Sequence, residues 1–242
     1  MNKKPGRWLL SREKLQPVSG QHYSDSGYHS NVYRTRVSKG REIARKVPVR
    51  ETGFEALSLK EKKALAEKWA KIMLAFRKAG LPVPRWWKAD LRTGKGIEPG
   101  IYMHWFPHEK GWVILKELIY NTRFSRHKAL IEGIASDLGK VHALGYAAMH
   151  VEDLWMVKLP EQKRVIIDVA DLIKQGGKQA KAHDIIVMLN QLGGHETRMF
   201  FVQNYFKQNK DPKVWEQLMH MLKETPLEFG RQLYRQGNTF RP

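Results

Sequence analysis

The sequence predicts an α+β protein with a strand-rich first half, one long helix in that half, and a mainly helical second half. Three observations predict this arrangement. β-Branched and aromatic residues at 31–37 and 42–49 flank a Ser-Lys-Gly-Arg turn, which is typical of a hairpin. Apolar residues then recur at helical spacing from Leu65 to Phe76. Beyond Pro107 helical spacing dominates, so we divide the chain into residues 1–105 and 106–242.

The long helix of the first half has clear end signals. Ser58-Leu-Lys-Glu61 is a capping box, in which a hydroxyl and a carboxylate satisfy free amides at a helix start. Gly80 ends the helix, and Pro82 and Pro84 prevent its resumption. Strands are expected around residues 86–87 and 100–106.

The second half is expected to contain several helices and one short hairpin. One helix covers residues 130–141 and ends before Gly145, and others lie near 180–192, 197–207 and 212–224. Two apolar segments, 154–159 and 164–167, flank Pro160-Glu-Gln-Lys and predict the hairpin.

Composition limits the function classes. The chain has 43 Lys and Arg against 24 Asp and Glu, a net charge of +19, which attracts polyanions such as nucleotides, nucleic acid or an acidic substrate; a solvated basic surface without a specific partner is the alternative. It has no cysteine, no apolar run long enough for a membrane span and no secretory pattern at its start, so we expect a cytoplasmic protein. No His-Glu-x-x-His or Walker A motif occurs.

The strongest local signal is Val165-Ile-Ile-Asp168. A short apolar strand that ends in a carboxylate places a hard oxygen ligand at a loop, where Mg²⁺ could take it together with phosphate oxygens. Asp171 is the alternative ligand if the register shifts by three residues. Upstream, Gly27-x-x-Ser30-x-Val32 predicts a loop whose backbone amides approach phosphate, with an ordinary strand-entry turn as the alternative.

Five motifs in this order resemble the protein-kinase-like superfamily, in particular its small bacterial aminoglycoside phosphotransferase and lipopolysaccharide kinase branches. The resemblance covers roughly residues 20 to 192. It rests on Gly27-x-x-Ser30-x-Val32, Lys46, Glu67, His150-x-x-Asp153 and Val165-Ile-Ile-Asp168.

The resemblance implies a two-lobed kinase-like fold that binds ATP and Mg²⁺. Lys46 would pair with the α- and β-phosphates and Glu67 would orient it by an ion pair. Arg45 would take the phosphate-binding role if the register shifts by one residue, or Lys46 could be an ordinary solvated lysine of a strand. Glu61 is the alternative to Glu67. The stretch from Met103 to Trp105 would connect the lobes and offer backbone groups to adenine.

The loop at His150-Val-Glu-Asp153 departs from the family pattern and allows two registers. In the first, Asp153 is the base that takes the acceptor's proton, and the metal-binding Asn position falls on Lys158. In the second, Asp153 replaces that Asn and the base position falls on Ala148. Glu152 could then substitute as base by proximity. A third interpretation is that Glu152 and Asp153 are turn residues without a chemical role.

Asp168 corresponds to the family's metal-binding Asp. Asp184 corresponds to an Asp that braces the catalytic loop through backbone amides, although a charge at a helix N-terminus would also explain it. We therefore expect a kinase, a transferase of phosphate from ATP to a hydroxyl of a protein or of an anionic small molecule or glycolipid. The alternatives are a pseudokinase that acts by association and a basic nucleic-acid-binding protein.

Overall fold

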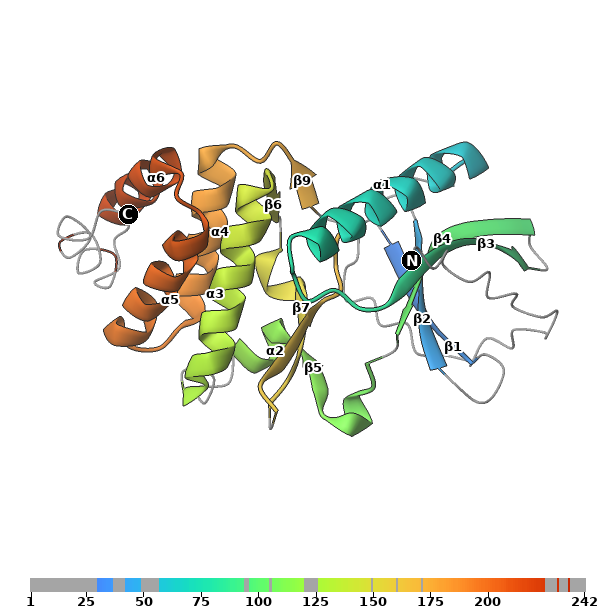
Figure 1. Ribbon diagram of the computed structural model, residues 1–242, viewed down its shortest axis with the longest axis horizontal. Helices are drawn as coiled ribbons and strands as arrows, with labels where there is room; N and C mark the ends of the chain where they lie inside the picture. Colours follow the sequence, from blue (N-terminus) through green and yellow to red (C-terminus); the bar gives the residue numbers. More distant parts are fainter. Residues whose placement is uncertain are drawn as a thin grey trace, which may run out of the picture. The chain divides into compact units, whose positions relative to one another are not determined.

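The computed structural model describes residues 30–36, 42–48, 57–93, 96–104, 106–119, 126–148, 150–159, 161–170, 172–224, 230 and 235. Within these residues the chain forms two compact units (Figure 1). The first contains four strands and the long helix α1 up to Lys71. The second contains Ile72–Pro84, which includes the rest of α1, and the described residues from Pro107 onward.

The first unit is a four-stranded antiparallel sheet with the order β1-β2-β4-β3. Its strands are β1 (Ser30–Arg36), β2 (Glu42–Pro48), β3 (Trp86–Thr93) and β4 (Gly96–His104). A Cβ on Gly100 would lie 2.8 Å from the Lys46 carbonyl oxygen. The missing side chain therefore allows β4 to approach the backbone of β2 closely.

Helix α1 (Leu59–Lys78) begins at the predicted capping box. The Ser58 amide donates to Glu61 Oε2 at 2.8 Å, and the Glu61 amide donates to Ser58 Oγ at 3.3 Å. The helix buries Trp69, Ile72, Met73 and Phe76 as expected, and the chain leaves it through Gly80 at φ +71°. The predicted cap, buried face and helix end are confirmed.

Replacing Ser58 with alanine should lower the unfolding free energy by about 1 kcal/mol, because the Glu61 amide loses its acceptor. Thermal unfolding followed by circular dichroism measures the change. Ser136→Ala is the matched control, since Ser136 lies inside a helix where alanine is the better helix former. Equal losses in the two variants would contradict a capping role.

The strands of the second unit form two small antiparallel sheets. A three-stranded sheet has the order β5-β7-β8, and a two-stranded sheet pairs β6 with β9. The strands are β5 (Trp112–Ile114), β6 (Tyr146–Ala148), β7 (Trp155–Lys158), β8 (Lys163–Ile166) and β9 (Leu172–Lys174). The predicted hairpin is confirmed as β7–β8.

Helices make up most of the second unit, as Figure 1 shows. They are α2 (Leu115–Ile119), α3 (Lys128–Ala143), α4 (Lys178–Gln191), α5 (His195–Gln208) and α6 (Pro212–Glu224), with short 3₁₀ turns η2 (His108–Lys110) and η4 (Val151–Asp153). Helix α3 packs on α5, and α4 packs on α6. A Cβ on Gly139 of α3 would lie 2.6 Å from the Tyr205 carbonyl oxygen, so glycine permits this close contact.

The α+β class is confirmed by these small antiparallel sheets and their helices. The sequence patterns did not predict β5, α2, β6 or β9, which are only three to five residues long. In the part of the chain that the structure describes, no helix is long and apolar enough to span a membrane.

Candidate functional site

Two of the predicted carboxylates lie at the same end of the β7–β8 hairpin. Asp153 closes η4 just before β7, and Asp168 follows β8 by two residues. Trp155 pairs with Ile166 at this end of the ladder. Because antiparallel pairing places residues before one strand beside residues after the other, the register brings Asp153 and Asp168 together.

Hydrogen bonds fix the segment that carries Asp168. The Ile167 amide donates to the Leu154 carbonyl at 2.9 Å, and the Asp168 amide donates to the same oxygen at 3.5 Å. Asp168 Oδ1 accepts from the Ala170 amide at 2.9 Å. The carboxylate is thus held in a short turn that its own side chain stabilises.

The pKa of the Asp153 carboxyl depends on its burial and on the charged residues around it. Burial raises the pKa of the Asp153 carboxyl, and the nearby charges of Glu152 and Asp168 raise it further. Lys116 opposes them and lowers the pKa, with its Nζ 3.7 Å from Asp153 Oδ2. A cation bound beside Asp153 would offset the repulsion that the neighbouring negative charges exert on its carboxylate.

The other two residues of the predicted catalytic loop lie in or next to the same turn. His150 precedes η4 and is exposed, and Glu152 lies inside η4 and is partly buried. Both charges act on the Asp153 carboxyl: Glu152 raises its pKa and His150 lowers it. The loop therefore presents Glu152 and Asp153 in one turn, next to Asp168.

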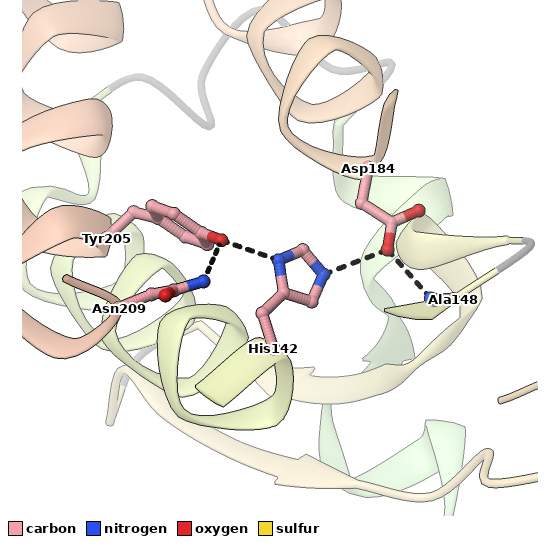
Figure 2. Close-up of polar contacts among 5 residues, drawn as sticks. All are labelled: His142, Ala148, Asp184, Tyr205 and Asn209. Atoms are coloured by element: carbon pink, nitrogen blue, oxygen red, sulfur yellow. Dashed lines mark hydrogen bonds and ion pairs between the residues drawn. The ribbon is translucent and has the colours of Figure 1, made fainter. Parts of the chain in front are cut away.

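A buried chain of hydrogen bonds fixes the start of this loop, as Figure 2 shows. Asp184 Oδ2 accepts from the Ala148 amide at 2.7 Å and contacts His142 Nε2 at 2.9 Å. His142 Nδ1 lies 2.7 Å from the Tyr205 hydroxyl, which also accepts from the Asn209 side-chain amide at 2.6 Å. Helices α3, α4 and α5 are thereby tied to the end of β6.

The hydrogen-bond partners of His142 show which of its ring nitrogens carries the proton. A carboxylate only accepts, so His142 Nε2 carries the hydrogen and Nδ1 accepts from the Tyr205 hydroxyl. Burial raises the pKa of Tyr205, which keeps that hydroxyl protonated. Burial lowers the pKa of His142, although the hydrogen bond that His142 donates to Asp184 acts in the opposite direction. The imidazole is therefore neutral, with one tautomer selected by its two partners.

This position for Asp184 corrects one alternative from the sequence. Helix α4 begins at Lys178, so Asp184 lies in the helix interior and is not a charge at its N-terminus. The sequence patterns placed this helix near residues 180–192, and the Gly177 that precedes its actual start offers no side-chain cap. What fixes Asp184 is its bond to the Ala148 amide.

The neutral His142 predicts acid sensitivity. A folded-state pKa below the ordinary 6.5 means that the unfolded chain binds the extra proton first. Stability is therefore full above about pH 6.5 and falls at lower pH, with a slope approaching about 1.4 kcal/mol per pH unit. Melting temperatures from pH 7.5 to 5 should fall less steeply in His142→Gln. An unchanged slope in that variant would contradict the assignment.

A second, partly buried pair holds β8 against α3. Arg164 donates from Nε to Asp137 Oδ2 at 2.6 Å and from Nη2 to Asp137 Oδ1 at 3.1 Å. Burial raises the pKa of the Asp137 carboxyl, and Arg164 opposes that rise. A Cβ on Gly133 would lie 2.3 Å from Arg164 Cζ, so glycine leaves room for the guanidinium. This pair fixes the strand that leads to Asp168.

Lys46 lies on β2 of the first unit and is buried, with 3% of its surface exposed. Its Nζ lies 5.7 Å from the centre of the Trp69 ring, a cation–π distance. This burial excludes the alternative of a solvated strand lysine. Glu67 on α1 forms an ion pair with Lys88 of β3, which lowers the pKa of Glu67. Orientation of Lys46 by Glu67 stays a prediction.

The remaining nucleotide-binding candidates belong to the first half of the chain. Met103 is buried in β4, where it pairs with Ala44 and Trp86. Ser30 and Val32 lie in β1, opposite Pro48 and Lys46. Gly27 and Trp105 lie outside the described residues.

Sequence reasoning missed the partners that support the site. Asp137 and His142 interrupt the apolar face of α3, with exposed fractions of 1% and 0%. Polar residues at core positions of a helix must find partners, which is the signal that identifies them. Their partners Arg164 and Tyr205, and the ion pair of Lys116 with Asp153, carry no comparable signal.

Comparison with known proteins gives no assignment: no family model matches the chain, and no curated protein matches it. The described residues contain no group of three or more His, Asp or Glu side chains able to hold a metal. The pair of Asp153 and Asp168 is thus the arrangement on which a functional conclusion rests.

Proposed function

We propose that this protein is a phosphotransferase of the protein-kinase-like superfamily that uses ATP and Mg²⁺. The observation that carries the proposal is the juxtaposition of Asp153 and Asp168 at one end of the β7–β8 hairpin. It favours the register in which Asp153 replaces the family's metal-binding Asn. Mg²⁺ typically takes one or two carboxylates and completes its shell with phosphate oxygens and water. Two carboxylates fit that requirement.

In the proposed reaction, a hydroxyl oxygen of the acceptor forms a bond to the γ-phosphorus of ATP. The bond from that phosphorus to the bridging oxygen of ADP breaks, and the hydroxyl proton is released. Mg²⁺ would neutralise phosphate charge. Asp153 and Asp168 would hold that ion, and Glu152 of the same turn is available to accept the proton. Catalysis of this kind depends mainly on positioning and electrostatics.

The Asp184 contact supports the same register. It holds the Ala148 amide at 2.7 Å, as the resemblance implies for the residue that braces the catalytic loop. The four-stranded antiparallel sheet with α1 after its second strand, and the mainly helical second unit, agree with the expected two-lobed architecture. The charge of +19 favours an acidic acceptor, such as a phosphorylated small molecule or glycolipid.

One observation favours a second function. Ala148 occupies the base position in this register, and its methyl group cannot accept a proton. A pseudokinase, which binds nucleotide without transferring phosphate, would tolerate that residue. Only product formation separates the two functions.

The test is the melting temperature of the full chain with and without ATP plus Mg²⁺, followed by an assay for ADP release. A ligand that binds only the folded state stabilises it by about 2.7 kcal/mol at a hundredfold excess over its dissociation constant. A metal-dependent rise with ADP release supports the enzyme, and a rise without turnover supports the pseudokinase. No rise at millimolar ATP rejects both.

A further inference from the structure

We infer that Lys116 contacts the terminal phosphate of the bound nucleotide and so distinguishes ATP from ADP. The inference rests on the proposed function and assigns a role that the motifs did not suggest. Lys116 lies 37 residues before Asp153, outside the predicted loop, yet its Nζ is 3.7 Å from Asp153 Oδ2.

Strand register places this lysine. Ile114, the last residue of β5, pairs with Met156 of β7 in an antiparallel ladder. The chain after Ile114 therefore runs beside the chain before Met156, which contains Asp153. Helix α2 begins at once and is anchored by Leu115 and Leu118, with exposed fractions of 0% and 6%. The position of Lys116 beside η4 is thus built into the sheet.

The pair of Lys116 and Asp153 has the character of a binding contact. The Lys116 and Asp153 side chains are 39% and 31% exposed, whereas those of Arg164 and Asp137 are 26% and 2% exposed. An ion pair that is partly exposed to solvent contributes only modestly to stability. The separation of 3.7 Å exceeds an ordinary hydrogen bond. An ammonium has three donors, so Lys116 can stay near Asp153 and still reach an anion.

The chemistry of the site needs such a cation. The turn from Val151 to Asp153 supplies two carboxylates and no positive charge. Phosphoryl transfer places developing charge on the terminal phosphate oxygens, and positioned cations stabilise it. Lys116 lies beside a carboxylate that would hold the metal–phosphate complex, so its ammonium is placed to meet the outermost phosphate.

The experiment compares ADP with the non-hydrolysable β,γ-imido analogue of ATP, each with Mg²⁺, by isothermal titration calorimetry of the full chain. The Lys116 ammonium would contact the terminal phosphate of the analogue, and ADP lacks that phosphate. Lys116→Met should therefore weaken binding of the analogue about tenfold and change binding of ADP by no more than about twofold. Lys116→Arg should retain most of the discrimination. Lys163→Met is the control, since Lys163 is exposed at the opposite end of the β7–β8 hairpin.

Three outcomes of these titrations would contradict the role of Lys116. Unchanged binding of both nucleotides by Lys116→Met would overturn the role of Lys116 and leave the proposed function standing. Equal weakening of both would overturn contact with the terminal phosphate. Failure of the wild-type chain to bind either nucleotide at millimolar concentration would reject the proposed function, and this inference with it.

Discussion

Under the proposed function, replacing Asp168 with asparagine is expected to abolish the Mg²⁺-dependent stabilisation of the chain by ATP. At a hundredfold excess of ligand the gain expected for the wild-type chain is about 2.7 kcal/mol, which corresponds to a rise of about 5–11 °C in melting temperature. Asparagine lacks the negative charge that attracts the metal. Its Oδ1 can still accept from the Ala170 amide, as Asp168 Oδ1 does at 2.9 Å. The variant should therefore fold while losing the metal-dependent part of the rise.

Glu161→Gln is the matched control for this change. This variant also converts a carboxylate of the same unit to an amide. Glu161, however, is exposed in the turn of the β7–β8 hairpin, at the end of the hairpin far from Asp168. Melting is measured for both variants with ATP in Mg²⁺ and in EDTA. A full rise in Asp168→Asn would exclude that carboxylate as the metal ligand and leave Asp171 as the sequence alternative.

Much of the fold follows from local sequence signals. The capping box at Ser58 and Glu61, the end of α1 at Gly80 and the β7–β8 hairpin involve residues close together in the chain. Their geometry depends on backbone conformations and short-range hydrogen bonds that residue type specifies. For the same reason, the hairpin alone predicts that Asp153 and Asp168 lie close together.

The supporting contacts could not be predicted in this way. His142 meets Asp184 and Tyr205, which lie 42 and 63 residues further along the chain. Periodicity shows which face of a helix is buried but not which helix covers it. β5 is only three residues long, so its pairing with β7 has no periodic signal. Lys116 reaches Asp153 through that pairing, and the sequence patterns therefore missed it.

Replacing Asp184 with alanine is expected to cause the largest loss of stability of the changes considered. It leaves the Ala148 amide and His142 Nε2–H without their acceptor in a site where His142 and Asp184 are 0% and 1% exposed. Each buried unsatisfied donor costs about 1–3 kcal/mol, so we expect a loss of about 3 kcal/mol and a fall of about 6–12 °C in melting temperature. Asp184→Asn should lose less, because its oxygen can still accept from one donor.

Tyr205→Phe separates the bracing of the loop from general packing. It removes only the hydroxyl that donates to His142 Nδ1, and it leaves Asp184 and the Ala148 amide paired. Hydrogen exchange at the Ala148 amide should accelerate strongly in Asp184→Ala, less in Asp184→Asn and little in Tyr205→Phe. Because that amide precedes the turn that carries Asp153, the Asp184 variants should also reduce the ATP-dependent rise in melting temperature. An Asp184→Ala chain with a protected Ala148 amide and a full ATP response would show that the contact does not position the loop.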